Sequence, residues 1–256
     1  MQADWSLLTR ELNFWSNAGI APRLWLRDDD AIAPSKALDR LLALCDRYEV
    51  PVVLAIIPEP TGEELARHLG DIDLASVAVH GWRHANHAAA DEKKQELGKH
   101  RPVVDIVDEL SRGLSKLSTL YGEKSLPMLV PPWNRMDPLL MSPLSAAGFR
   151  AVSSFADALV DLETPDLAVI NARLDIIDWP RRRGADSAEL AKHVVRELQK
   201  SREGGFYPIG VLTHHLAHDE SAWDFLDQLL EMTALGETCK WLPGPELLPS
   251  RSQARA

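Results

Sequence analysis

Short apolar segments alternate with amphipathic segments along almost the whole chain, and this alternation restricts the fold more than any other feature. Apolar runs that suit buried strands lie at 24–26, 52–57, 77–79, 128–130, 150–152, 168–170 and 209–212. Apolar residues at helical spacing occur at 4–17, 34–48, 63–69, 105–121, 138–147, 187–200 and 223–233. About seven strand–helix units predict parallel strands in a closed or nearly closed α/β barrel. In such a barrel, the polar residues at the carboxyl ends of the strands are the candidates for chemistry.

The composition is typical of a globular protein and argues against two classes of partner. Hydrophobic residues make up 45% of the 256 positions and charged residues 26%, as in ordinary folded domains. The formal net charge of −10 disfavours nucleic acid and anionic membranes, which bind dense basic surfaces. No apolar stretch approaches the ~20 residues that span a bilayer, so no membrane insertion is expected. The first residues do not show the pattern of a secretion signal, and we interpret Cys45 and Cys239 as reduced. We therefore expect a cytoplasmic protein.

Three adjacent carboxylates follow the first strand, from Asp28 to Asp30. At the mouth of a buried strand they repel one another unless a cation or a proton offsets their charge. Two interpretations of this segment stay open when it is taken alone. One is a capping acid before the helix near Pro34, with a solvated loop, and the other is a set of ligands for a cation.

Two histidines four residues apart, His80 and His84, follow the third strand. If the chain turns helically there, both imidazoles face one ion, because residues i and i+4 share a helix face. A lone histidine is more often a core or loop residue, but two imidazoles and one aspartate make a His2Asp set with an open position. This donor set predicts a catalytic divalent metal ion, with zinc as the first choice.

The turn after the fourth strand contains two prolines followed by Trp133. Paired prolines stiffen a turn, which suits either a plain strand exit with a packed tryptophan or a backbone N–H presented to a developing oxyanion. Further along, Asp175 and Asp178 lie beside Trp179. These residues either cap a helix or orient catalytic groups while the indole lines a pocket.

The last strand runs into three histidines, His214, His215 and His218. Three imidazoles within five residues, at the exit of an apolar strand, predict that one of them belongs to the site. An imidazole in that place is suited to protonating a leaving amine.

Taken in order, these segments resemble the motifs of the polysaccharide deacetylase family, the NodB homology or carbohydrate esterase family 4-like group. The motifs are Asp-Asp, His-x-x-x-His, Pro-Pro-aromatic, Asp-x-x-Asp-Trp and Leu-x-His, and they cover roughly residues 23 to 235. The resemblance implies a distorted (β/α)7 barrel and a metal-dependent deacetylase that acts on non-peptide C–N bonds. It also implies three segments: an N-terminal helical extension at 1–22, the barrel domain at 23–246 and a polar tail at 247–256.

The resemblance implies a role for each matching residue. Asp28 is expected to be the general base and His214 the general acid. The expected metal ligands are Asp29, His80 and His84. Trp133 is expected to stabilise the oxyanion through its backbone N–H, and Asp175 to orient the catalytic groups. The resemblance places Trp179 in the wall of the site. Trp82 and Arg135, which it does not assign, are further residues that we expect to contact the substrate.

Some positions depart from the family pattern and leave alternatives open. In the family, the third motif usually opens with an arginine, but this sequence has Val130 at that position. The arginines that could take its role are Arg27, Arg83 or Arg135. Asp30 stands where many members have glycine. The base and ligand are therefore either the first two or the last two of the three aspartates. His215, beside His214, is a second candidate for the acid.

The expected reaction is hydrolysis of an N-acyl amide, first of all an N-acetyl group on an amino sugar or polysaccharide. One alternative is an amide of a small non-sugar metabolite, because the same chemistry does not depend on what lies beyond the carbonyl. Another is a non-catalytic carbohydrate-binding domain. A two-metal phosphoesterase is disfavoured, because it needs more bridging carboxylates than the sequence offers. The expected partner is thus a carbohydrate or other small molecule, and the sequence carries no signal for an oligomeric state.

Overall fold

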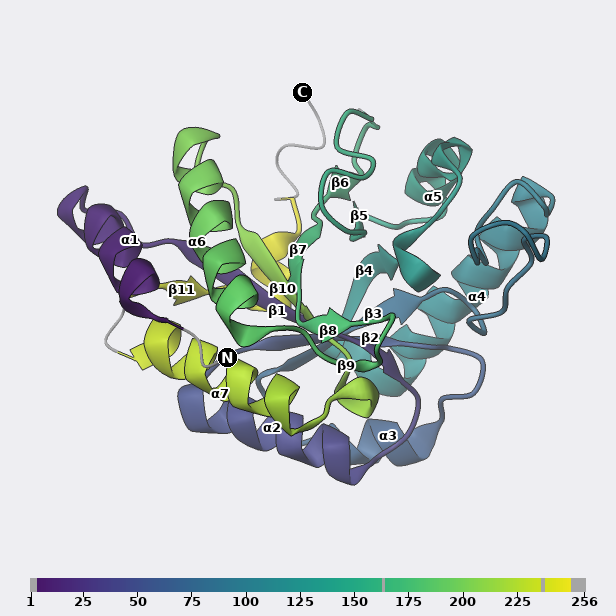
Figure 1. The fold of residues 1–256 in the computed structure, drawn as a ribbon. Coiled ribbons are helices and arrows are strands. Elements are labelled where there is room, and N and C mark those ends of the chain that lie inside the picture. Colours follow the sequence, from purple (N-terminus) through teal and green to yellow (C-terminus); the bar gives the residue numbers. More distant parts are fainter. Residues whose placement is uncertain (1–3, 163, 236–237, 250–256) are drawn as a thin grey trace. The chain divides into compact units, whose positions relative to one another are not determined.

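The structure is a computed structural model that describes residues 4–162, 164–235 and 238–249. A path of hydrogen-bonded strands runs in the order β6-β5-β4-β3-β2-β1-β10-β7, and β11 also pairs with β1. The pairs β1–β10, β1–β11, β10–β7, β3–β4, β4–β5 and β5–β6 are parallel. Helices alternate with most of these strands along the chain (Figure 1). This order confirms the predicted α/β class and the distorted (β/α)7 barrel.

The chain divides into two compact units. The first unit comprises Met1–Asp28, Ser35–Val52 and Ala172–Pro243, and the second comprises Asp29–Pro34, Val53–Asn171 and Gly244–Ala256. Strand β1 therefore passes from the first unit into the second between Asp28 and Asp29. The predicted segments 1–22, 23–246 and 247–256 stay a prediction, and positions 250–256 lie outside the described residues.

In the first unit, amphipathic helices pack on short parallel strands. The strands are β1 (Arg23–Ala31, through Asp28), β7 (Ala172–Asp175), β10 (Ile209–Thr213) and β11 (Lys240–Trp241). The helices are α1 (Ser6–Asn17), α2 (Lys36–Tyr48), α6 (Ser187–Glu203) and α7 (Glu220–Ala234), with a short turn, η4 (His215–Ala217). A hairpin joins β8 (Ile177–Asp178) to β9 (Arg183–Gly184). Side-chain oxygens cap three of these helices at Ser35, Asp186 and Asp219, which explains where the helices begin.

In the second unit, five strands of the path follow one another. They are β2 (Val52–Ile56, from Val53), β3 (Ala75–His80), β4 (Ser125–Val130), β5 (Ala151–Val152) and β6 (Ala168–Val169). The helices are α3 (Glu63–His68), α4 (Val103–Tyr121), α5 (Met141–Ala146) and α8 (Gly244–Leu247), with short turns η1 (Gly122–Lys124), η2 (Pro132–Asn134) and η3 (Pro138–Leu140). Every residue of β2 is buried, as its continuous apolar run predicts.

One local prediction near the site is wrong, and the helical turn considered for the two histidines is not present. The first strand does not end at the acids, because β1 continues through them to Ala31 and Asp28 pairs with Thr213 in the sheet. The segment from His80 to His84 is not helical: Gly81 and His84 have φ angles of 63° and 57°, in the left-handed region. A run with two such residues cannot continue a right-handed helix.

None of the helices in the described part of the chain combines the length and the apolar character that a membrane span needs.

Candidate active site

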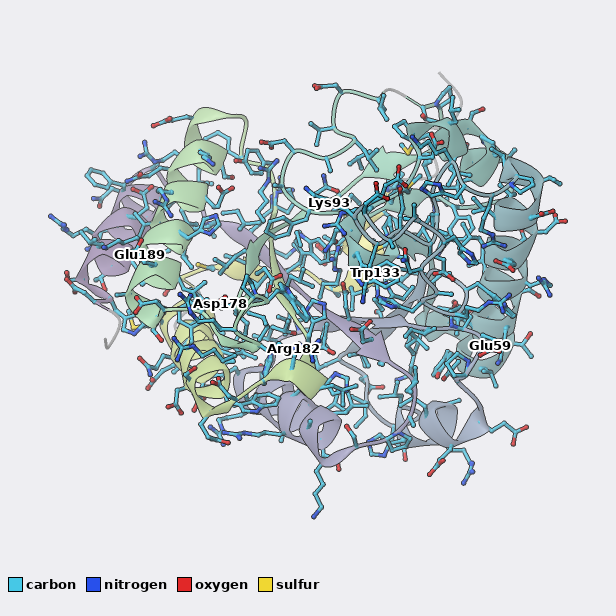
Figure 2. The ribbon with its side chains drawn as sticks, turned by 45° about the vertical axis from the view of Figure 1, so that its right-hand side comes forward. Glu59, Lys93, Trp133, Asp178, Arg182 and Glu189 are labelled. Carbon is cyan, nitrogen blue, oxygen red and sulfur yellow. The ribbon has the colours of Figure 1, made fainter. Side chains whose placement is uncertain are left out.

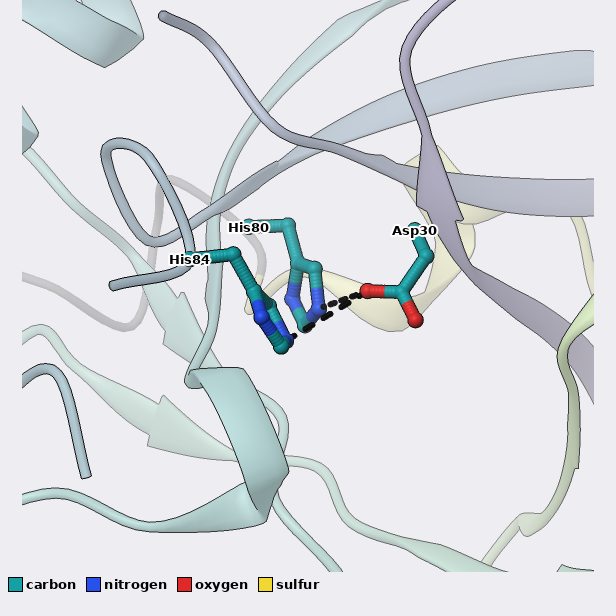
Figure 3. A group of neighbouring side chains, drawn as sticks. All are labelled: Asp30, His80 and His84. Carbon is teal, nitrogen blue, oxygen red and sulfur yellow. Dashed lines mark hydrogen bonds and ion pairs between the residues drawn. The ribbon is translucent and has the colours of Figure 1, made fainter. Parts of the chain in front are cut away.

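Asp30, His80 and His84 form a compact group in the second unit, here called the metal group (Figure 3). Asp30 Oδ1 lies 3.1 Å from His80 Nε2 and 3.4 Å from His84 Nε2, and the three ligand atoms all lie within 4.8 Å of one another. Donor atoms on one tetrahedral zinc ion, each about 2.0 Å from it, are about 3.3 Å apart. The spacing therefore fits one small divalent ion. The carboxylate in the group belongs to Asp30, one residue after the predicted ligand Asp29.

A backbone carbonyl fixes which nitrogen of His80 faces Asp30. His80 Nδ1 lies 2.9 Å from Val130 O, and a carbonyl only accepts, so Nδ1 carries the proton. In the neutral ring, Nε2 then presents a lone pair to the carboxylate, an arrangement that favours a cation or a proton between them. Burial alone would lower the pKa of His80, but its bond to Asp30 and the charges of Asp29 and Asp30 raise it overall. The same negative charges attract a divalent ion.

The surroundings of His84 favour the form that binds metal. Burial and the neighbouring His80 lower the pKa of His84, which favours the neutral imidazole. Its ring packs against Trp133, with 4.2 Å between the ring centroids. The backbone of Asp30, His84 and Trp133 is left-handed at all three positions, with φ of 74°, 57° and 54°. Such non-glycine residues are strained and persist where the surroundings fix them, often at functional sites.

A buried carboxylate holds the turn that carries His84. Glu96 is fully buried and accepts the backbone N–H groups of Arg83 at 3.0 Å and Trp82 at 3.4 Å. A Cβ on Gly81 would overlap Glu96 Oε2 and would lie 2.5 Å from Pro132 Cγ. Only glycine fits there, both for the left-handed backbone and for the lack of space. Sequence reasoning missed Glu96, because no local pattern links it to the histidines.

The turn after β4 presents one backbone donor beside the metal group. Proline has no N–H, so the first N–H after Pro131 and Pro132 is that of Trp133. Within the described part of the chain this N–H donates no hydrogen bond, whereas the N–H groups of Asn134 and Arg135 bond back to the two proline carbonyls. The arrangement is compatible with the predicted oxyanion donor.

Asp28 belongs to a different group, in the first unit, together with Thr213 and His215. Asp28 Oδ1 lies 2.5 Å from His215 Nδ1, and Oδ2 accepts bonds from Thr213 Oγ1 at 2.7 Å and from the His215 N–H at 2.9 Å. Burial alone would raise the pKa of Asp28, but His215 and Thr213 lower it overall. Asp28 is fully buried, with both carboxylate oxygens occupied. These contacts leave little room for Asp28 to take a proton from water.

The predicted acid packs against the predicted pocket residues of the same unit. His214 meets Trp179 edge-on, with 4.5 Å between ring centroids, and Trp179 Nε1 donates to Asp175 Oδ2 at 2.8 Å. Trp179 is 45% exposed, so its other surface is open to solvent. Asp178 instead pairs with Arg181 at 2.7 Å within the β8–β9 hairpin, where Figure 2 shows Asp178 and Arg182.

The arginines named as substitutes at the third motif differ in their surroundings. Arg83 pairs with Glu109 at 3.2 Å, and Arg135 Nη1 donates to the Lys94 carbonyl at 3.1 Å. Arg27 is fully buried on β1, directly before the acids.

The two remaining residues expected at the substrate stay predictions. The Trp82 ring lies under the Arg112 guanidinium, 4.9 Å from its carbon, and Arg135 has the carbonyl contact described above.

Like Glu96, the contact between Asp28 and His215 was missed by sequence reasoning. Side chains alternate between the two faces of a strand, so neighbouring residues at the end of the last strand face different surroundings. This alternation could have indicated that Thr213 and His215 have other contacts than His214.

No protein-family model and no curated protein matches this sequence. Solved structures do match it. A family 4 carbohydrate esterase from Streptomyces lividans in complex with acetate is 16% identical, with a TM-score of 0.57 over 88% of this chain and 94% of that one. A candidate polysaccharide deacetylase from Mycobacterium smegmatis is 16% identical, with a TM-score of 0.65 over 88% of each chain.

A family 4 acetyl xylan esterase from Clostridium thermocellum in complex with a cobalt ion is 15% identical, with a TM-score of 0.55 over 88% of this chain and 89% of that one. A family 4 pseudoenzyme from Bacillus anthracis matches as well, so the likeness does not decide activity. The chain has the fold of the family 4 carbohydrate esterases and polysaccharide deacetylases.

Proposed function

We propose that this protein is a metal-dependent hydrolase that removes an acetyl group from the nitrogen of an amino sugar or polysaccharide. The observation that carries the proposal is the metal group, whose donor spacing fits one divalent ion. The shared fold supports the same reaction class. Two of the matching structures contain acetate or a cobalt ion, which agrees with acetyl chemistry at a divalent metal.

Asp30, His80 and His84 would hold the ion, and zinc suits two nitrogens and one oxygen with an open position. When bound, such an ion lowers the pKa of a water molecule and polarises an acyl oxygen. His80 would offer Nε2, because its Nδ1 proton is committed to the Val130 carbonyl. Trp133 would keep the His84 ring in place through their ring contact.

We assign the general base to Asp29, one residue after the predicted Asp28. The family order is base first and ligand second. With Asp30 in the metal group, that order places the base on Asp29. Asp28 has both oxygens engaged by Thr213 and His215, whereas Asp29 directly precedes the ligand in the chain. Asp29 would take a proton from the attacking water.

The remaining groups would stabilise the tetrahedral intermediate and assist its breakdown. The Trp133 N–H would bond to the oxyanion, and the stiff proline pair would hold that N–H in place. His214 would protonate the departing nitrogen, which yields acetate and a free amine. Asp175 would orient Trp179, and Trp179 in turn would support the His214 ring.

The proposal is tested by acetate release from N-acetylglucosamine oligomers, using zinc-loaded protein. Wild type should release acetate, and Asp29→Asn should lose most of that activity. Asp137→Asn is a matched control, because Asp137 caps η3 through Leu139 N–H and asparagine caps equally well. The control should keep wild-type activity. Absence of acetate release by the zinc-loaded wild type from every N-acetyl sugar tested would refute the proposal.

A further inference from the structure

The pair Asp28 and His215 has no part in the reaction steps described above. Their side chains are 0% and 1% exposed, and the carboxylate faces the imidazole at 2.5 Å. A buried hydrogen-bonded pair depends on both partners, because loss of one leaves the polar atoms of the other buried without a partner. Burial of these polar groups costs free energy, and their contacts show which part of the chain they hold in place.

Among the described residues, the three bonds of the Asp28 carboxylate go to the two residues that flank His214. The Thr213 hydroxyl and the His215 N–H both bond to Oδ2, and the His215 ring bonds to Oδ1. The sheet register places Asp28 directly beside Thr213. Asp28 therefore fixes the chain immediately before and immediately after His214.

The strand geometry carries this constraint to the His214 side chain. Successive side chains of an extended strand point to opposite faces. His214 itself has an extended φ of −144°, between the end of β10 and η4. Thr213 and His215 contact Asp28, and His214 contacts Trp179. With Thr213 and His215 both bonded to Asp28, the imidazole of His214 is directed away from that carboxylate, towards Trp179.

We propose that Asp28 and His215 are positioning residues, which hold the His214 imidazole in the orientation that delivers its proton to the leaving nitrogen. The inference rests on the proposed function, since it assigns His214 the role of the acid. It gives His215 a role distinct from that of the acid, although the two histidines are adjacent in the sequence.

The test compares two substrates whose leaving groups differ in their need for a proton. The amine of an N-acetyl sugar must be protonated before it can depart. The p-nitrophenolate group of p-nitrophenyl acetate departs as an anion and needs no proton. In His215→Leu, kcat for the N-acetyl sugar should fall on the order of 10²-fold, the scale of general acid catalysis. The kcat for p-nitrophenyl acetate, both KM values and the bound zinc should change little.

Two further variants make the test independent of folding defects. His215→Asn keeps a donor at the place of Nδ1 and should restore most of the amide activity. Thr213→Val removes one of the three bonds and should lower the ratio of amide to ester turnover several-fold. Tyr121→Phe is the control, because it removes a different buried bond, Thr61 Oγ1 to Tyr121 Oη at 3.2 Å, and should leave the ratio unchanged.

An equal loss on both substrates, or an unchanged ratio in folded His215→Leu and Thr213→Val, would overturn the inference. Wild type that cleaves neither substrate would refute the proposed function itself, and this inference with it. The two failures are therefore distinguishable.

Discussion

Replacing Gly81 by alanine should weaken both the fold and the binding of zinc. Gly81 has a φ of 63°, and an alanine in the left-handed region costs about 1–2 kcal/mol. The added Cβ would overlap Glu96 Oε2 and would lie 2.5 Å from Pro132 Cγ. Glu96 cannot retreat without releasing the N–H groups of Arg83 and Trp82, and overpacking of this kind costs about 1–3 kcal/mol. The free energy of unfolding should therefore fall by about 2–5 kcal/mol.

Gly19→Ala separates the two contributions. Gly19 also has a left-handed φ, 68°, after the last turn of α1, but nothing lies within 4 Å of an added Cβ there. Its replacement should cost only the backbone strain, about 1–2 kcal/mol. The difference between the two variants then measures the overlap with Glu96 and Pro132.

The assays are urea unfolding of the metal-free protein and zinc titration of the folded protein. Gly81 lies next to His80 and three residues before His84, so we expect zinc affinity to fall by at least about tenfold in Gly81→Ala, as for disturbed supports of metal ligands. Gly19→Ala should bind zinc like wild type. Equal stability and equal zinc affinity in the two variants would show that Glu96 does not hold the histidine turn.

Two other predictions concern the first unit. Burial alone would raise the pKa of Glu197, but bonds to His193 and Lys200 and the charge of Arg173 lower it from 4.5 to about 2. Because the folded-state pKa lies below the unfolded one, Glu197→Gln should cost up to about 3 kcal/mol of stability above pH 4.5. That cost should disappear as the pH falls towards 2, and urea unfolding of both proteins across this range checks it. Trp179→Phe removes the bond to Asp175 and should lower kcat several-fold with bound zinc unchanged, which steady-state kinetics and elemental analysis measure.

The sequence predicted the fold well because the relevant signals are local. Continuous apolar runs such as Val52 to Ile57, bounded by prolines, mark strands buried on both faces, and amphipathic spacing marks the helices between them. The His-x-x-x-His spacing likewise led to two imidazoles that do converge. Their convergence depends on left-handed residues and not on a helical turn.

The rest of the candidate site depends on contacts between distant parts of the chain. Which aspartate joins the histidines follows from the path of β1 and the left-handed backbone at Asp30, and a run of three identical residues cannot reveal it. The contact of Asp28 with His215 follows from the register of β1 against β10, two strands far apart in sequence. His214 and His215 are adjacent in the sequence, but in the fold His215 contacts Asp28 and His214 contacts Trp179.

The measurement that tests the metal group most directly is the zinc content of three proteins after loading and dialysis: wild type, Asp30→Asn and Asp29→Asn. We predict about one zinc ion per chain in wild type and in Asp29→Asn, since Asp30 is the carboxylate grouped with the two histidines in the described part of the chain. Asp30→Asn should retain little zinc. Zinc at the wild-type level in Asp30→Asn, or its loss only in Asp29→Asn, would contradict the assignment of Asp30 as the ligand.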